Sequence, residues 1–317
     1  MMSTILVTGG AGFIGSNLCR RLLDNLQNHV ICFDNLTTGN INNVRVLLET
    51  ERFNIVNGDI LDILDVLDSS YKIDEIYNLA CPAAPLKYQE DPIYTTKVNT
   101  IGVLNLLNLA RKNHAKFLQA STSEVYGDPL IFPQKENYLG NVNCTGIRSC
   151  YDEGKRCAES LIFDYARKYG SLVKVVRIFN TYGPFMSADD GRVISNFIVQ
   201  ALRGENLTIY GRGEQTRSFC YIDDLVDGLL KMMSTEDSFQ GPVNLGNPDE
   251  RTIFDVASLI RLYCENSSDF SYKALPKDDP KRRCPDISLA MNVLKWKPKV
   301  DLEVGLEKTI QYFRDIV

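Results

Sequence analysis

The chain has 317 residues, of which 44% are hydrophobic and 24% are charged, and it carries a net charge of −5 at pH 7. This length allows for two lobes, and the composition is that of a globular protein in water. A membrane-spanning helix, nucleic acid as the main partner and a metal site are not expected, because there is no long apolar run, no large basic block, no Cys-x-x-Cys spacing and only two histidines.

The first predicted strand begins within a few residues of the first methionine, which leaves no room for a signal peptide. We therefore expect a cytoplasmic protein. In that reducing compartment cysteines stay as free thiols, and Cys32, Cys157 and Cys220 stand among apolar residues, where a thiol packs as a small hydrophobe.

Apolar runs of strand length alternate with longer helical stretches over the first 180 residues. Strands and helices that alternate in this way form right-handed crossovers, which build a parallel sheet covered by helices on both faces. The sequence therefore predicts an α/β protein with a doubly wound parallel sheet of the Rossmann type. Strands are expected at 4–8, 30–34, 53–57, 75–79, 116–121 and 173–178, and helices at 16–26, 98–112 and 152–169.

The pattern changes after about residue 180, where loops rich in Gly and Pro separate fewer and more scattered strands. We expect a Rossmann domain over 1–180 and a smaller mixed α/β lobe over 181–317. Residues 221–247 are expected to return to the sheet, so the boundary is not a single cut.

A glycine-rich turn follows the first strand in the stretch VTGGAGFIGSNLCRRLL, where Gly9, Gly12 and Gly15 have the Gly-x-x-Gly-x-x-Gly spacing. Small residues at this spacing let backbone N–H groups approach a pyrophosphate at the positive end of the following helix. Glycines often make only a tight turn. Here an apolar strand before, an amphipathic helix after and Asp34 at the end of the next strand favour a dinucleotide site.

Asp34 stands where a carboxylate accepts hydrogen bonds from a ribose diol and repels a 2′-phosphate, although an acid there can also be a simple turn residue. The expected cofactor is therefore NAD rather than NADP. Asp59, at the end of the third strand, is placed to meet the adenine. The candidate cofactor contacts are Gly9, Gly12, Phe13, Ile14, Asp34, Asn35, Thr38, Gly39, Asp59, Ile60, Leu79, Tyr151, Lys155 and Thr181.

Tyr151 is the one tyrosine among fifteen that has a lysine, Lys155, four residues further on, and both fall in a predicted helix. Residues at this spacing share one helical face. A phenol is a poor base at neutral pH, but a neighbouring ammonium and a cationic nicotinamide favour the phenolate. Such a pair can also be an ordinary exposed one, and the dinucleotide turn in the same chain favours the catalytic interpretation.

The glycine turn, the Tyr-x-x-x-Lys pair and a hydroxyl at the end of the fifth strand together resemble the extended short-chain dehydrogenase/reductase family. The resemblance implies that Thr122 orients a substrate alcohol, that Tyr151 is the base and that Lys155 holds the phenol and the nicotinamide ribose.

Glu124 needs a separate explanation, because a dehydrogenase requires only the hydroxyl, the tyrosine and the lysine. In LQASTSEVYGDP it follows Ser123, and it either caps the next turn, pairs with a basic loop or handles a proton or water at a carbon next to the oxidised one. Nucleotide-sugar 4,6-dehydratases carry an Asp where Ser123 stands, and 4-epimerases usually lack the Glu. STSEVYGDP instead resembles the UDP-glucuronic acid decarboxylases, also called UDP-xylose synthases.

Further stretches resemble the same enzymes in the same order, from Ile5 to about Phe313. They include LACPAAPLKY, in which Cys81 replaces the usual Ser, and CYDEGKR, RIFNTYGP and DDPKRRCPDI. The resemblance implies that UDP-glucuronate is oxidised at C4, loses CO₂ and is reduced to UDP-xylose with NAD recycled.

The resemblance also assigns residues to the substrate. It places Arg283 at the carboxylate, although a solvated basic loop is the alternative and Arg282 is adjacent. Arg217 suits the diphosphate, because a guanidinium binds two oxygens at once. The candidate substrate contacts are Lys97, Asn180, Arg192, Tyr210, Gln215 and Arg217.

The family further implies a homodimer in which helices 98–112 and 152–169 of two copies form a four-helix contact. The apolar residues that suggest this contact are Val103, Leu106, Leu107, Leu161, Ile162 and Tyr165. Two other functions stay open: a 4-epimerase that acts on UDP-glucuronate, and a non-catalytic NAD-binding scaffold.

Overall fold

The computed structural model describes residues 3–67, 71–274 and 282–317. Within them, the larger half is a seven-stranded parallel sheet with the order β11-β6-β5-β4-β1-β2-β3, so the predicted doubly wound sheet is confirmed. Each of the six strands expected from the sequence is present, with ends shifted by at most two residues. The strands are β1 (Ser3–Thr8), β2 (Asn28–Asp34), β3 (Phe53–Asn57), β4 (Glu75–Asn78), β5 (Lys116–Thr122), β6 (Val173–Ile178) and β11 (Val243–Leu245).

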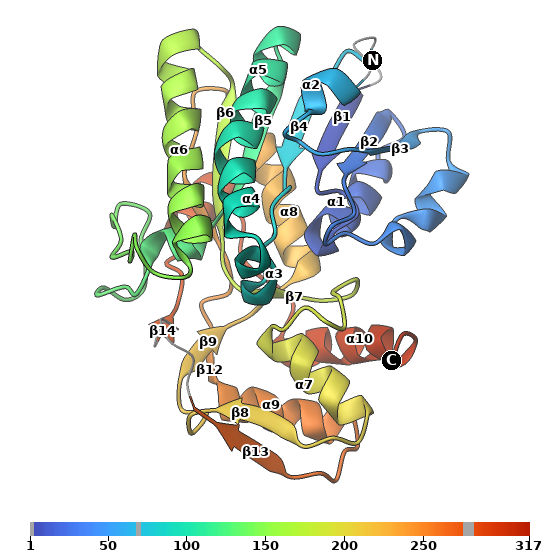
Figure 1. Ribbon diagram of the computed structural model, residues 1–317, viewed down its shortest axis with the longest axis vertical. Coiled ribbons are helices and arrows are strands. Elements are labelled where there is room, and N and C mark those ends of the chain that lie inside the picture. Colours follow the sequence, from blue (N-terminus) through green and yellow to red (C-terminus); the bar gives the residue numbers. More distant parts are fainter. Residues whose placement is uncertain (1–2, 68–70, 275–281) are drawn as a thin grey trace.

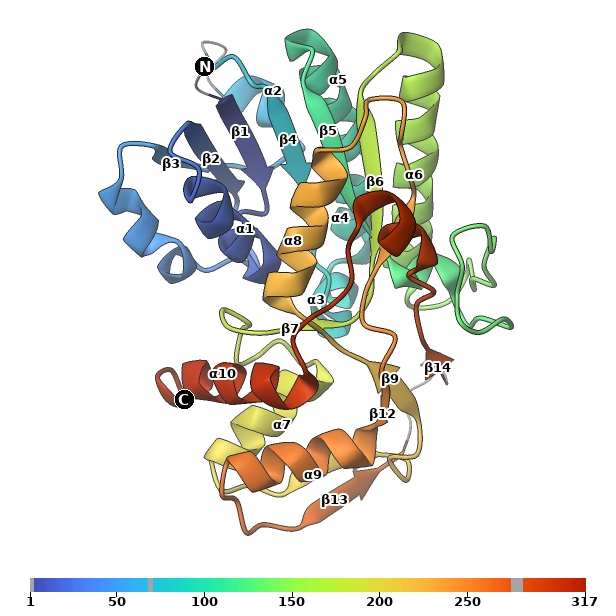
Figure 2. The ribbon, with the colours of Figure 1, turned by 180° about the vertical axis from the view of Figure 1, so that it is seen from behind.

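Helices cover both faces of this sheet (Figures 1 and 2). On one face lie α1 (Phe13–Leu23) and α8 (Ile222–Met233), and on the other lie α2 (Ile63–Val66), α5 (Val103–Asn113) and α6 (Ser149–Tyr169). The apolar residues between helices and sheet form two separate buried clusters, one for each face. This arrangement explains why the sheet strands are almost continuously hydrophobic.

The predicted helix at 16–26 lies at 13–23 instead. The prediction placed its start too late because Gly12, which belongs to the glycine turn, is itself the residue that caps the helix. The segment predicted as one helix at 98–112 begins with a π-helical turn, η3 (Val98–Gly102), and continues as α5.

The smaller lobe lies below the sheet in Figure 1 and contains three longer helices among its described residues: α7 (Val193–Leu202), α9 (Ile253–Tyr263) and α10 (Leu302–Arg314). Its strands form short sheets, one of which has the order β12-β9-β14. The strands are β7 (Thr181–Tyr182), β8 (Leu207–Tyr210), β9 (Thr216–Ser218), β10 (Cys220–Tyr221), β12 (Glu250–Thr252), β13 (Phe270–Lys273) and β14 (Arg282–Arg283).

Shorter helical turns connect these elements: η1 (Ile41–Asn43), η2 (Arg45–Glu49), α3 (Pro85–Glu90), α4 (Pro92–Lys97), η4 (Ser123–Tyr126) and η5 (Ala290–Leu294). Across the described ranges, no helix combines the length and the apolar character that a bilayer crossing requires. The boundary between 1–180 and 181–317 stays a prediction, and α8 and β11 lie in the larger half although they follow residue 181.

One expectation about apolar residues was wrong, and another holds only in part. Cys157 is exposed on the outer side of α6, whereas Cys32 and Cys220 are buried as expected. Four of the residues that suggested a four-helix contact are instead packed in the core against the sheet, because the same helical stripe must cover the strands. These four are Val103, Leu106, Leu107 and Ile162.

A buried ion pair joins β6 to α6. Arg177 donates to both carboxylate oxygens of Glu159, at 3.0 and 2.7 Å, and Ser121 donates to the same carboxylate at 2.6 Å. Arg177 also donates to the Tyr126 hydroxyl, which in turn donates to Asn244 on β11 at 2.7 Å. This network therefore links β5, β6, β11 and α6 directly beneath the residues that follow β5.

We expect Arg177→Met to lower the free energy of unfolding by about 3–5 kcal/mol, because Glu159 would remain buried as an unpaired charge. Urea denaturation of the holoprotein measures the change. The double variant Arg177→Met/Glu159→Gln should recover part of the loss, since it leaves no charge alone. Arg167→Met is the matched control, because its ion pair with Asp164 is exposed and is expected to contribute less than about 1 kcal/mol. A cost for the single variant as small as that of the control would contradict this account.

Candidate active site

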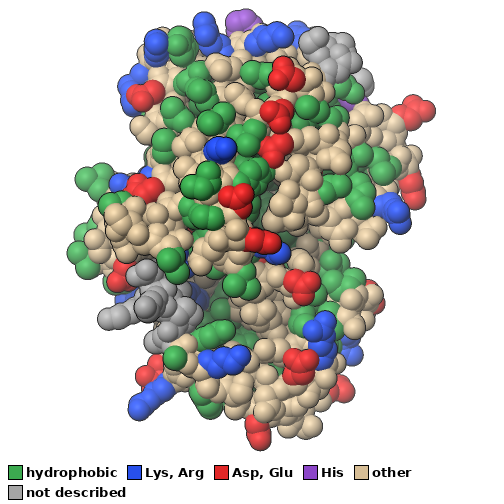
Figure 3. All heavy atoms as spheres, in the orientation of Figure 1, with side chains coloured by type: hydrophobic (Ala, Val, Ile, Leu, Met, Phe, Trp, Pro, Cys, Tyr) green, Lys and Arg blue, Asp and Glu red, His purple; other side chains and the backbone are tan. Residues whose placement is uncertain are grey.

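A cleft of about 1620 Å³ lies at the carboxyl edge of the parallel sheet, where the sheet faces the smaller lobe. The surface is hollowed between the two halves in the space-filling view (Figure 3). Parallel strands end at one edge, so β1, β2, β4 and β5 bring Gly9, Asp34, Leu79 and Thr122 to the same side. The cleft is lined by every predicted site residue except Lys97.

The prediction that Lys97 contacts the substrate was wrong. It is exposed at the end of α4 and does not line the cleft. The side of this segment that faces inward carries Thr95, Val98 and Asn99, which are buried, and Lys97 therefore points away from the substrate region.

The glycine turn has the close packing that a dinucleotide requires. Gly9 has φ +70°, and a Cβ there would lie 2.8 Å from the backbone of Leu79 and Ala80. A Cβ on Gly15 would lie 2.1 Å from the Gly9 carbonyl oxygen. No side chain caps the N-terminus of α1, so its first N–H groups are left for an anion such as a pyrophosphate. These residues fit the expected cofactor NAD.

Asp34 binds the glycine turn to the loop after β2. One carboxylate oxygen accepts from the Ala11 N–H at 2.9 Å, and the other accepts from the Leu36 N–H at 2.8 Å. Burial raises the pKa of Asp34, and these backbone hydrogen bonds oppose that rise. Gly39 leaves room beside the carboxylate, because a Cβ there would lie 2.7 Å from an Asp34 oxygen. Asp34 is thus both the predicted ribose contact and a structural anchor of the turn.

Asp59 sits in a small polar cluster at the other end of the cofactor side of the cleft. Its carboxylate accepts from Asn35 at 2.9 Å and from the hydroxyl of Tyr94 at 2.6 Å. Tyr94 lies on α4 and was not singled out in the sequence. The cluster holds Asn35 and Asp59 together at the position expected for the adenosine.

Thr122, Tyr151 and Lys155 meet at the centre of the cleft. Burial raises the pKa of Tyr151, and a hydrogen bond with Thr122 opposes that rise. Burial lowers the pKa of Lys155, whose ammonium donates to the Ala120 carbonyl at 3.0 Å and lies 5.8 Å from the centre of the Tyr151 ring. The predicted spacing on one helical face is confirmed, and burial opposes ionisation of the Tyr151 phenol.

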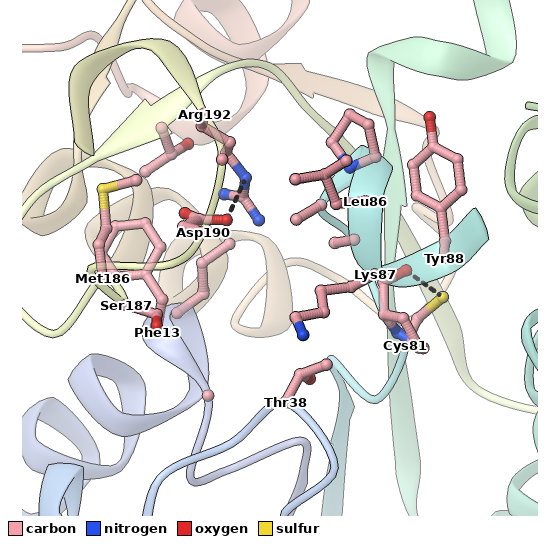
Figure 4. A pocket seen from close by; sticks show the side chains of 18 of the residues that line it. Phe13, Thr38, Cys81, Leu86, Lys87, Tyr88, Met186, Ser187, Asp190 and Arg192 are labelled. Carbon is pink, nitrogen blue, oxygen red and sulfur yellow. Dashed lines mark hydrogen bonds and ion pairs between the residues drawn. The ribbon is translucent and has the colours of Figure 1, made fainter. Parts of the chain in front are cut away.

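Tyr88, on α3, packs against Tyr151, the candidate base. Its ring stacks on that of Tyr151 with 4.9 Å between centroids and 8° between planes. Burial raises its pKa to about 12, and among the described residues its buried hydroxyl has no hydrogen-bond partner. Figure 4 shows Tyr88 and Cys81 on the same wall of the cleft. The Cys81 thiol accepts from Asn99 at 3.2 Å, and burial raises its pKa.

Glu124 lies between two arginines. One of its oxygens, Oε2, accepts from Arg148 at 2.5 Å and from Arg283 at 2.6 Å. Burial alone would raise the pKa of Glu124, but Arg283 and then Arg148 outweigh it and the pKa is lowered. The next turn, η4, is capped by Thr122, whose hydroxyl accepts from the Glu124 N–H at 3.2 Å. Of the three roles considered for Glu124, pairing with basic residues is the one seen in the geometry.

The structure separates the two adjacent arginines of the lobe. Successive residues of a strand point to opposite sides, so Arg283 is buried in the cleft while Arg282 faces outward and pairs with Glu250 at 2.5 Å. Gln134 holds the residue after Arg283 in place, because its side-chain oxygen accepts from the Cys284 N–H at 2.8 Å. The first part of the DDPKRRCPDI motif, residues 278–281, lies outside the described residues.

The far end of the cleft carries the remaining substrate candidates from the smaller lobe. Figure 4 shows Arg192 beside Asp190, with 3.2 Å between the paired atoms, across the cleft from Lys87. Gln215 donates to the Tyr210 carbonyl at 2.8 Å. In the described ranges, no group of three or more His, Cys, Asp or Glu side chains forms a potential metal site.

Sequence reasoning missed Arg148, Tyr88, Tyr94 and Gln134. Arg148 had a detectable signal, because it stands three residues before Tyr151 and therefore about one helical turn away. The other three come close to the site only through tertiary packing.

The sequence model of the NAD dependent epimerase/dehydratase family matches residues 5–246. UDP-glucuronic acid decarboxylase 5 from Arabidopsis thaliana is 50% identical over 310 residues, covering 98% of this chain and 89% of that protein. UDP-glucuronic acid decarboxylase 1 from Xenopus tropicalis is 50% identical over 311 residues, covering 98% of this chain and 72% of that protein. The crystal structure of UDP-glucuronic acid 4-epimerase from Bacillus cereus in complex with UDP-glucuronic acid and NAD is similar with a TM-score of 0.88 and 30% identity, covering 99% of this chain and 100% of that chain.

We expect Asp34→Ala to weaken NAD binding by about 10- to 100-fold, because two hydrogen bonds to a charged acceptor are lost. The preference for NAD over NADP should fall as well, since the carboxylate no longer repels a 2′-phosphate. Titration calorimetry of both cofactors measures the two effects, with the exposed Asp62→Ala as the control. An unchanged ratio of the two dissociation constants would show that Asp34 is only a turn residue.

Proposed function

The chain belongs to the NAD dependent epimerase/dehydratase family, and we propose that it converts UDP-glucuronate to UDP-xylose and CO₂ with NAD recycled. One observation carries the proposal: the oxidation candidates Thr122, Tyr151 and Lys155 share the cleft with a buried arginine, Arg283, that is paired with Glu124. The 50% identity to proteins named UDP-glucuronic acid decarboxylase supports the same conclusion.

The first step is oxidation at C4 of the sugar. Tyr151 acts as a phenolate, after its own proton has passed to solvent, and takes the proton of the 4-hydroxyl. Thr122 orients that hydroxyl through the hydrogen bond it shares with Tyr151. NAD, when bound, supplies the hydride acceptor and later the hydride donor, and its cationic ring lowers the cost of the phenolate. The Lys155 ammonium lies 5.8 Å from the centre of the Tyr151 ring, and its positive charge is proposed to stabilise the phenolate.

The second step is loss of CO₂ from C5. Oxidation at C4 makes the carboxylate β to a carbonyl, so the electrons of the breaking C5–C6 bond flow into the C4 oxygen as an enolate. Tyr151 and Thr122 stand at that oxygen and stabilise its charge. A proton from solvent then adds to C5, the hydride returns to C4, and Tyr151 gives back its proton to the C4 oxygen, which completes UDP-xylose. A β-keto acid needs no metal for this step, and Arg283 is proposed to hold the carboxylate until it leaves.

A 4-epimerase acting on UDP-glucuronate is the second candidate, because the similar Bacillus cereus structure is such an enzyme. It is the weaker candidate, since that likeness is at 30% identity while the decarboxylases are at 50%. The candidates differ in product: an epimerase keeps the carboxylate and a decarboxylase releases it.

The direct test is the product of UDP-glucuronate with the NAD-loaded protein, identified by mass and NMR together with trapping of CO₂. We expect UDP-xylose and one CO₂ for each sugar. Formation of UDP-galacturonate without CO₂ would favour the epimerase, and no turnover of any UDP-sugar would favour the non-catalytic scaffold.

We expect Tyr151→Phe to bind NAD and UDP-glucuronate but to lose turnover by several orders of magnitude. It removes the proton acceptor of the first step and leaves a ring that can still stack on Tyr88. Calorimetry and the CO₂ assay measure the two properties on the same preparation. A variant that keeps a tenth of the wild-type rate would show that another group is the base.

We also propose a homodimer through α5 and α6 of two copies. The support is the outer side of these helices, where Leu104 and Tyr169 are 36% and 40% exposed and where Leu161 and Tyr165 are partly buried. Sedimentation at micromolar concentration should give twice the chain mass of 35.8 kDa, and Leu104→Lys should shift it toward the monomer. A wild-type monomer would remove the proposal. The cytoplasmic location, like the dimer, stays a prediction.

A further inference from the structure

Arg148 stands at the N-terminus of α6 and faces the reacting part of the cleft. Its guanidinium lies 6.0 Å from the centre of the Tyr88 ring, and that ring stacks directly on Tyr151. Arg148 lines the cleft, and only about one turn of α6 separates it from Tyr151. A positive charge is therefore placed beside the ring that stacks on Tyr151, the residue that is proposed to act at C4.

The charges at this point do not balance. Among the described residues, Arg148 and Arg283 both bond to the single carboxylate of Glu124, so this group of three side chains carries two positive charges and one negative charge. The group of Arg148, Glu124 and Arg283 thus has an excess positive charge that attracts an anion.

Asp152 cancels this excess only in part. Its Oδ2 lies 3.8 Å from Nε of Arg148, which is longer than a hydrogen bond. Burial and then the charge of Glu124 raise the pKa of Asp152 to about 7. Asp152 does not line the cleft, whereas Arg148 does. It steadies the guanidinium without taking the place of an anion in the cleft.

One donor in this group is still available. Arg283 is only 9% exposed, and its Nε is buried without a hydrogen-bond partner among the described residues. A buried donor without a partner costs free energy, and an acceptor arriving in the cleft would satisfy it.

We infer that Arg148 is the second guanidinium of the site that binds the substrate carboxylate, and that Glu124 holds Arg148 and Arg283 in place for it. The inference rests on the proposed function. In UDP-glucuronate the carboxylate is on C5, next to the C4 hydroxyl that meets Tyr151. Arg148, Arg283 and Tyr151 line the same cleft, so a sugar whose C4 hydroxyl meets Tyr151 has its carboxylate on the neighbouring carbon within that cleft.

The removal of Arg148 has a specific consequence. Without it, Glu124 and Arg283 form an isolated pair with no net charge, and Arg283 turns to satisfy Glu124 alone. The substrate carboxylate then loses its attraction, while the nucleotide, which binds elsewhere in the cleft, is unaffected. Arg148 therefore discriminates between UDP-glucuronate and a UDP-hexose that has a hydroxymethyl group in place of the carboxylate.

The test compares Arg148→Met, which keeps length without charge, and Arg148→Lys, which keeps charge without the planar fork. Arg167→Met on the same helix is the control, because Arg167 is exposed at the far end of α6. Calorimetry on the NAD-loaded protein gives dissociation constants for UDP-glucuronate, UDP-glucose and UDP, and the CO₂ assay gives kcat and KM.

For Arg148→Met we expect binding of UDP-glucuronate to weaken by about 10- to 100-fold, with UDP and UDP-glucose within about twofold of wild type. Arg148→Lys should recover part of the loss. The inference is overturned if Arg148→Met weakens all three ligands equally, if it weakens none, or if Arg148→Lys binds no better than Arg148→Met. A wild-type protein that binds UDP-glucuronate but releases no CO₂ would refute the proposed decarboxylation, and the binding comparison would still decide the role of Arg148.

Discussion

Glu124 receives hydrogen bonds from two guanidiniums that belong to opposite halves of the molecule. Arg148 comes from α6, which packs on the sheet, and Arg283 comes from β14, in the smaller lobe. A buried carboxylate is stable only when it is paired, and so is each buried guanidinium. Of the two pairs, the one between Glu124 and Arg283 joins the two halves of the molecule, next to the place where the sugar is expected to react. Arg148 holds Glu124 from within the sheet half.

Arg283 needs more support than Arg148, because β14 has only two residues and helix α6 has twenty-one. That support comes from the sheet half of the molecule. The side-chain oxygen of Gln134 accepts from the Cys284 N–H, and the Gln134 N–H donates to the Cys284 carbonyl. The Gln134 carbonyl accepts from the Asp286 N–H at 2.8 Å. Asn244 on β11 donates to the carbonyls of Gln134 and Asp286, at 3.0 and 3.1 Å. The network that begins at Arg177 thus ends beside Arg283, so buried polar contacts in the sheet half determine where a residue of the lobe points.

These long-range contacts separate what the sequence could predict from what it could not. The sheet, the glycine turn and the Tyr151–Lys155 pair depend on spacing over a few residues, and each was predicted correctly in place. Glu124 and Arg283 are 159 residues apart, so no local pattern connects them, and their pairing was found only in the structure. Lys97 was assigned by resemblance alone, and its assignment failed because the rotation of a short helix determines which side faces the cleft.

The same limit explains the errors about apolar surface. A stripe of apolar residues shows that a helix has a buried side, but it does not show what buries it. For α5 and α6 the sheet takes most of that stripe, as Leu106 and Ile162 show, and only the flank with Leu104 remains outside. Cys157 lies on that outer side, where its apolar neighbours in sequence do not surround it in space.

Glu124 also answers a problem that any decarboxylase of this kind must solve. The site has to bind a carboxylate, yet the reaction moves the negative charge of that carboxylate into the ring as CO₂ leaves. Two arginines with no compensating charge would stabilise the bound carboxylate more than the transition state, which strengthens binding without raising the rate of the chemical step. With Glu124 between the two arginines, part of their positive charge is already neutralised. Their remaining attraction for the substrate carboxylate is enough for binding, and it opposes the loss of CO₂ less than two unpaired arginines would. Glu124 also affects Tyr151: burial is the main reason that the pKa of the phenol is raised, the charge of Glu124 adds to that rise, and the charge of Arg192 opposes it. The charges in the cleft are therefore a compromise between holding the carboxylate, releasing it and forming the phenolate.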